Sequence, residues 1–167
     1  MPEKTTVEKA RRAKRAGKVP TTQAGEFVHE EVRHVRRGEH GARSAQQVIA
    51  IGLSKARRAG VAVSPPRRGR AKEETRPSTK YAYEAGQHKR KTRRRPRVSR
   101  AVSRVLEREP RSSVSRSALS RQAKRAASRR TAAQRSAAAR KAVATKRSGG
   151  RSAAARKAAR TRARRKT

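Results

Sequence analysis

The chain has 167 residues, of which 50 are Lys or Arg and 11 are acidic, so its formal net charge is +39 and its pI about 12.0. Only 32% of the residues are hydrophobic and 2% aromatic, against roughly 45–50% apolar residues in an ordinary globular domain. This composition excludes one core spanning the whole chain. The absence of cysteine excludes disulfides and thiolate metal sites.

The N-terminus and the lengths of the apolar runs indicate in which cellular compartment we expect the protein. Residues 1–4 lack the apolar stretch of a signal peptide, and no apolar run approaches the ~18 residues that a membrane span needs. We therefore expect a soluble, cytoplasmic protein that does not insert into a membrane.

Positive charges increasingly outnumber negative charges from the N-terminus to the C-terminus. Residues 1–63 carry 14 Lys/Arg and 6 Glu (net +8), residues 64–109 carry 16 and 5 (net +11), and residues 110–167 carry 20 and none (net +20). Glu109 is the last acidic residue. The pattern predicts a mostly α protein with a small folded head and a polycationic tail that is largely disordered or conditionally helical.

Residues 1–20 are predicted to be a basic arm or a frayed polar helix. A short Lys/Arg-Ala stretch runs from Val7 to Ala16, and Gly17 and Pro20 end it.

Residues 21–63 are predicted to form a helical hairpin. In the first helix Thr22 is the expected N-cap, and Gly38 ends the helix. Its apolar positions follow the helical i, i+3, i+4 spacing: Ala24, Phe27, Val28, Val32 and Val35.

The second predicted helix begins with a Ser-x-x-Gln capping box, Ser44 to Gln47, and ends before Gly60. Its apolar face comprises Ala45, Val48, Ile49, Gly52, Leu53 and Ala56. A hairpin of about 40 residues is too small for a dependable core. We expect the arm, a second copy or a bound partner to complete it, the last two through the apolar faces of residues 24–56.

The segments His40-Gly41-Ala42-Arg43-Ser44 and Ala50-Ile51-Gly52-Leu53-Ser54-Lys55-Ala56-Arg57-Arg58-Ala59-Gly60 resemble a family of small basic bacterial proteins. Its members are often labelled DNA-binding or plasmid stabilisation proteins. The Arg-Ser-Ala-Ala-Ala-Arg-Lys-Ala tail is similar to tails of that family and of linker-histone-like bacterial proteins. The resemblance implies a bacterial origin and nucleic-acid binding.

Residues 64–97 are predicted to be a flexible Pro/Gly/Arg-rich linker. Four prolines and two glycines interrupt its basic runs. Tyr81 and Tyr83 could stack on an unpaired base, although exposed loop tyrosines are the commoner case.

Residues 98–167 form the predicted basic, Ala/Arg/Ser-rich tail. Helical spacing of apolar residues extends from Val98 to Glu109, and Pro110 stops it. Residues 113–147 contain no Pro or Gly, which permits one long helix. Arginines recur near every fifth position and would turn by about 140° per step on that helix. Because no acid offsets their repulsion, we expect this helix to form when phosphates neutralise it.

Enzymatic and metal chemistry are not expected. His29 and His34 are five residues apart, about 140° around a helix, whereas the zinc-protease motif needs a spacing of four. We therefore interpret them as solvent-facing, and we predict no catalytic residue, no metal site and no cofactor.

The sequence favours binding to DNA without sequence specificity, by phosphate neutralisation, in a nucleoid-associated architectural role. Association with RNA or with the ribosome would use the same attraction between basic side chains and phosphates. Two rival hypotheses assign function to the head: a helix-turn-helix with Ser44, Gln46 and Gln47 near the bases, or a partner-docking module using the Phe27–Val35 face. The predicted nucleic-acid-binding residues are Arg93, Arg94, Arg95, Arg111, Arg116, Arg121, Arg125, Arg130, Arg135, Arg140, Arg151, Arg156, Arg160 and Arg164.

Overall fold

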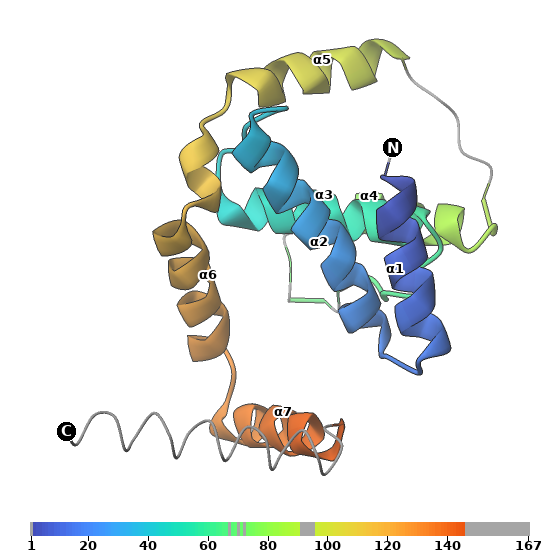
Figure 1. Cartoon of the computed structure of the whole chain (residues 1–167), viewed down its shortest axis with the longest axis vertical. Coiled ribbons are helices and arrows are strands. Elements are labelled where there is room, and N and C mark those ends of the chain that lie inside the picture. The colour runs from blue at the N-terminus through green and yellow to red at the C-terminus, as the bar shows by residue number, and fades with distance from the viewer. Residues whose placement is uncertain (1, 67, 70, 72, 91–95, 146–167) are drawn as a thin grey trace. The chain divides into compact units, whose positions relative to one another are not determined.

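The computed structural model describes residues 2–66, 68–69, 71, 73–90 and 96–145. Within them every regular element is helical, which confirms the mostly α fold class. Two compact units are distinguished, residues 1–122 and 123–167. The elements, labelled in Figure 1 except for η1, are α1 (Lys4–Arg15), α2 (Pro20–Arg37), α3 (Ala45–Arg58), α4 (Thr75–Gly86), α5 (Pro96–Arg108), the 3-10 helix η1 (Arg111–Val114), α6 (Arg116–Ser128) and α7 (Ala132–Thr145).

The helical hairpin is confirmed as α2 and α3, with one correction at its start. Pro20 occupies the first turn of α2 and Val19 is the N-cap, so Thr22 lies inside the helix. Proline suits this position because its missing N–H would have no intrahelical partner. Gly38 ends α2 with φ +82°, and the Ser44 hydroxyl accepts a hydrogen bond from the Gln47 N–H at 3.3 Å.

The N-terminal arm is a helix that completes the core of the head. Helix α1 packs along α2, and the two run side by side in Figure 1. Thr6 and Ala10 of α1 are buried, and Val7 packs against the same core. The buried cluster consists of Ala10, Ala24, Phe27, Ala56, Val61 and Val63. Of the three ways to complete the hairpin, the structure uses the arm.

Helices α2 and α3 approach closely at Gly52. A Cβ built there would lie 2.7 Å from the Val28 Cα and 3.0 Å from the Phe27 carbonyl oxygen. Glycine at this point lets the two backbones meet and brings the Phe27 ring into the core, where it is fully buried.

The predicted linker contains a folded element, so that prediction is corrected for residues 75–86. Helix α4 packs on α3 through buried Ala82 and Gly86, and a Cβ at Gly86 would collide with the Arg57 carbonyl oxygen. Pro77 lies in the first turn of α4, where a missing N–H costs little. Gly86 was interpreted as part of a flexible segment, whereas it permits close contact between α4 and α3.

The predicted tail boundary at residue 98 also needs correction. Val114, within η1, is buried in a second cluster with Val32, Val35, Ala42 and Val48, and Leu119 packs against it. The Ala42 N–H donates to the Pro110 carbonyl oxygen at 3.2 Å. Residues beyond 98 thus take part in the head, and the compact unit ends at Gln122.

The long helix that the sequence permits over residues 113–147 is divided within the described residues into α6 and α7. Helix α6 starts after Ser115, whose hydroxyl accepts from the Ala118 N–H at 3.2 Å. Helix α7 starts after Thr131, whose hydroxyl accepts from the Gln134 N–H at 3.2 Å while the Gln134 amide oxygen accepts from the Thr131 N–H at 3.3 Å. This reciprocal capping box is a local signal for a new helix start.

Candidate nucleic-acid interface

Helices α6 and α7 carry exposed arginines along their length. The structure places Arg116, Arg121 and Arg125 on α6, and Arg135 and Arg140 on α7, all of them exposed. Neither helix contains an acidic residue. Their guanidinium groups are therefore available to an external anion.

The five-residue arginine series does not follow one continuous helix. Arg111 belongs to η1 and Arg130 lies between α6 and α7, because Ser115 and Thr131 begin new helices. On α6 the step from Arg116 to Arg121 turns the charge by about 140°, and the step from Arg135 to Arg140 does the same on α7. Each helix thus presents cations on more than one side.

Arg111 lies against the head. Its guanidinium carbon is 2.7 Å from the position that a Cβ on Gly38 would occupy. Nearby, Arg36 Nη2 donates to the Val114 carbonyl oxygen at 3.4 Å. Arg111 is exposed but is positioned by the end of α2, so it belongs to the surface of the head.

Half of the predicted binding residues cannot be assigned to this surface. They lie outside the described residues: Arg93, Arg94, Arg95, Arg151, Arg156, Arg160 and Arg164.

Helix α5 presents a basic face that the sequence prediction left out. Arg97, Arg100, Arg104 and Arg108 are exposed and follow helical spacing, opposite the exposed valines at 98, 102 and 105. The apolar stripe of this helix was recognised from the sequence. The arginine spacing in the same segment was the signal that would have added these residues.

Ion pairs are unevenly distributed along the described part of the chain. Seven cations up to Arg90 have a carboxylate within 4.0 Å: Arg33, Arg37, Lys55, Arg68, Arg76, Lys80 and Arg90. Among the side chains described from residue 96 to residue 140, no Lys or Arg has a described carboxylate within 4.0 Å. The described cations of this stretch therefore have no ion-pair partner among the described residues.

Inside the head, two adjacent carboxylates are buried. Glu30 and Glu31 are 0% and 1% exposed, and Lys55 Nζ lies 3.3 Å from Glu30 Oε1 and 2.6 Å from Glu31 Oε2. Burial alone would lower the pKa of Lys55, but the two carboxylates outweigh it and raise that pKa above its ordinary value. Lys55 thus compensates part of the charge of these two buried acids inside the head.

The interpretation of both histidines as solvent-facing is wrong for His34. His29 is exposed, whereas His34 is buried and its Nε2 lies 3.0 Å from Glu3 Oε1. The hydrogen bond with His34 is the main cause that lowers the pKa of Glu3, with Arg33 and Arg37 adding to it. Helix α2 faces α1 and the loop after Gly38 on this side, which explains the burial.

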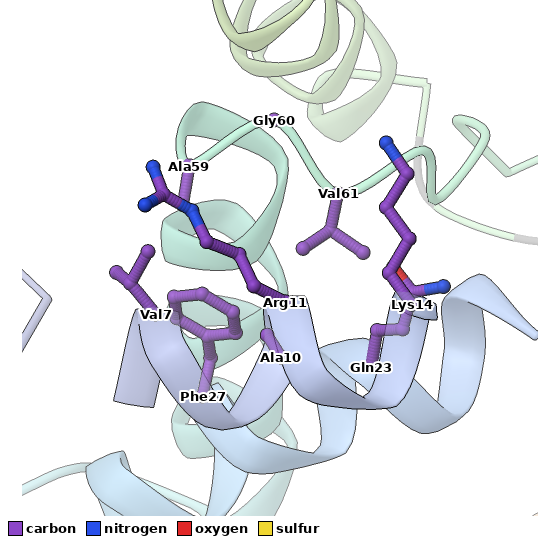
Figure 2. Close-up of a pocket in the computed structure, with 9 residues that line it drawn as sticks. All are labelled: Val7, Ala10, Arg11, Lys14, Gln23, Phe27, Ala59, Gly60 and Val61. Atoms are coloured by element: carbon purple, nitrogen blue, oxygen red, sulfur yellow. The ribbon is translucent and has the colours of Figure 1, made fainter. Parts of the chain in front are cut away.

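A small hollow opens between α1, α2 and the turn after α3 (Figure 2). Its volume is about 120 Å³, well below the roughly 300 Å³ at which organic-ligand pockets begin. Phe27 and Val61 line it, and the charged ends of Arg11 and Lys14 extend away on either side in Figure 2. The stems of these two cations thus cover core residues.

The two hypotheses that assign function to the head meet structural obstacles. Phe27 and Val35 are fully buried within this chain, so the Phe27–Val35 face is not free to dock a partner. At the start of α3 the Ser44 hydroxyl caps the helix, and Gln47 Oε1 accepts from the Arg43 N–H at 2.8 Å. The Ser44 and Gln47 side chains are therefore engaged in local structure, whereas Gln46 is exposed.

Comparisons with known proteins give no assignment. No family model, curated protein or solved structure matches the chain. Within the described residues, no helix combines the length and apolar character required to cross a membrane.

Proposed function

We propose that this protein binds duplex DNA with little sequence preference and acts as a nucleoid-associated architectural protein. The observation that carries the proposal is the run of exposed, carboxylate-free cations on α6 and α7, within a C-terminal part of 58 residues that has 20 Lys/Arg and no acid. Such cations replace condensed counterions on phosphates, and the released counterions supply the binding free energy.

The choice of cation supports phosphate contact. The chain has 36 Arg and 14 Lys, and a guanidinium group makes planar, bidentate contacts with phosphate. The resemblance of residues 40–60 to small basic bacterial proteins labelled DNA-binding or plasmid stabilisation agrees with this proposal. The basic face of α5 adds four arginines to the same function.

Fluorescence anisotropy with the full chain tests the proposal. We expect two duplexes of equal length and unrelated sequence to bind with affinities within about tenfold, because specific binders usually discriminate by 10³ or more. Gln46→Ala at the exposed start of α3 serves as the control and should leave both affinities unchanged.

Two results would contradict it. A preference of about 10³ or more between the duplexes, lost in Gln46→Ala, would indicate a sequence-specific regulator that reads bases with α3. A stem-loop RNA bound more than about tenfold better than either duplex would instead assign the charged surface to RNA.

A further inference from the structure

Three metal-ligand side chains meet at the C-terminal end of α2. Glu31, His34 and His40 each offer one ligand atom, and these atoms all lie within 4.8 Å of one another. Glu31 is 1% exposed, His34 is 9% exposed and His40 is partly buried. The group is independent of the tail arginines on which the proposed function rests.

The backbone explains why the three residues converge. Glu31 and His34 are three residues apart on α2, so both side chains lie on one face of the helix. The left-handed turn at Gly38 reverses the chain, and the Gly41 N–H donates to the Leu106 carbonyl oxygen at 2.7 Å. This hydrogen bond holds the loop so that the His40 ring returns to Glu31.

The contacts of His40 leave one ring nitrogen facing a carboxylate. His40 Nδ1 lies 2.9 Å from the Gly41 carbonyl oxygen, which can only accept, so Nδ1 carries a hydrogen. His40 Nε2 lies 2.9 Å from Glu31 Oε1. In a neutral imidazole this Nε2 has a lone pair directed at an acceptor, so a cation must lie between them, either a proton or a metal ion. A carbonyl on Nδ1 is also the usual outer partner of a metal-bound histidine.

The surroundings attract a divalent cation despite the net charge of the chain. Four carboxylates gather here, those of Glu3, Glu30, Glu31 and Glu39, and they contact three permanent cations, Arg33, Arg37 and Lys55. With both histidines neutral, this cluster retains one negative charge. Elsewhere the positive field would repel a metal ion, so binding requires a site of this kind.

We propose that Glu31, His34 and His40 form a zinc site. Two imidazole nitrogens and one carboxylate oxygen form a known three-ligand set for Zn²⁺, whereas Mg²⁺ and Ca²⁺ prefer oxygen ligands. A water molecule fills the fourth position, because Glu3 and Glu39, whose carboxylate oxygens lie 3.0 Å and 3.6 Å from His34 Nε2, do not belong to the converging group. Bound zinc would fasten the end of α2 to the loop that also holds the end of α5.

The spacing of His29 and His34 that argued against a metal does not bear on this site. His29 is exposed on α2 and contributes no ligand atom to the group, while His40 lies in a loop that a helical spacing rule does not cover. His29 therefore provides a matched control on the same helix as His34.

Isothermal titration of the metal-free full chain with zinc chloride tests the site. We expect one Zn²⁺ per chain, with an affinity that falls by more than about 100-fold in His34→Gln and in His40→Gln. That loss exceeds the roughly 10–100-fold typical of changing an outer partner. His29→Gln should bind zinc as the unchanged chain does, and zinc should raise the melting temperature of both.

Cobalt substitution keeps the proposal testable if a variant fails to fold. Co²⁺ in the unchanged chain should give the intense visible bands of a tetrahedral site with nitrogen and oxygen ligands, and zinc should abolish them. Absence of these bands, absence of zinc binding, or equal zinc affinity in His34→Gln, His40→Gln and His29→Gln would overturn the proposal and leave a proton as the cation between His40 and Glu31.

Discussion

Lys55 is the residue on which the interior electrostatics of the head depend. It is 19% exposed at its side chain and lies within 3.3 Å of both buried carboxylates, Glu30 and Glu31. Removing it would take away the cation that the two buried acids share. Breaking a buried ion pair in this way is far more costly than losing a surface pair.

Lys55→Met should therefore destabilise the full chain by about 3–5 kcal/mol, as measured by urea denaturation followed by circular dichroism. The matched control is Lys80→Met, because Lys80 is mostly exposed and 3.7 Å from Glu84, and it should cost less than about 1 kcal/mol. The same cost in both variants would contradict the proposed role of Lys55.

The pH dependence of the free energy of unfolding gives a second test of the role of Lys55. Folding raises the pKa of Lys55 above its ordinary value of 10.5, so folding favours the protonated amine. This contribution is fully present below about pH 10.5 and is lost as pH rises through the folded-state pKa. The unchanged chain should lose more stability over this alkaline range than Lys55→Met. Parallel pH profiles would contradict this assignment.

At the scale of elements, packing of α2 on α3 depends on one glycine. A Cβ at Gly52 would lie 2.7 Å from the Val28 Cα, which is backbone and cannot move aside cheaply. Gly25, on the same helix as Val28, has open space around its own Cβ position. A Cβ atom would thus be too close to backbone at Gly52, whereas it fits without contact at Gly25.

Gly52→Ala should destabilise the chain by about 1–3 kcal/mol, since it forces the helices apart. Gly25→Ala should stabilise it by about 0.5–1 kcal/mol, because alanine favours an exposed helix interior. Melting temperatures of the two variants provide the measurement. A stabilising Gly52→Ala would mean that the two backbones are not in close contact.

Strong local signals made much of the fold predictable. Periodic apolar residues with a glycine stop predicted α2, and Ser44 predicted the start of α3. Helix α4 was missed because its contact with α3 uses Ala82 and Gly86, which add almost no apolar signal. The burial of Val114 was missed because it depends on partners far earlier in the chain, Val32 and Val35 among them.

The candidate site shows the same division between local and long-range information. Exposed cations on α6 and α7 follow from composition alone, since no acid in that part of the sequence could pair with them. The group of Glu31, His34 and His40 was not predicted, because the loop around Gly38 and Gly41 brings His40 back to α2. No spacing rule for a single helix describes that return.

At the scale of the whole molecule, we expect DNA binding to depend more on where the positive charges lie than on the total net charge. Acidic residues up to Glu84 pair with nearby cations, while residues 110–167 contain no acid. If phosphates bind chiefly to the C-terminal part, cations removed there should affect DNA binding more than the same number removed from the head. Two variants with equal net charge separate these effects.

The most direct measurement is the salt dependence of DNA affinity for these two variants. The first replaces Arg121, Arg125, Arg135 and Arg140 by Gln; the second replaces Lys9, Arg12, Arg15 and Lys18, which are exposed on or just after α1, by the same residue. Each neutralised phosphate contributes about −0.9 to the slope of log K against log salt concentration, so the first variant should flatten the slope by up to about 3.6. The second should change it by less than about 1. Equal flattening in both variants would contradict binding through the C-terminal cations.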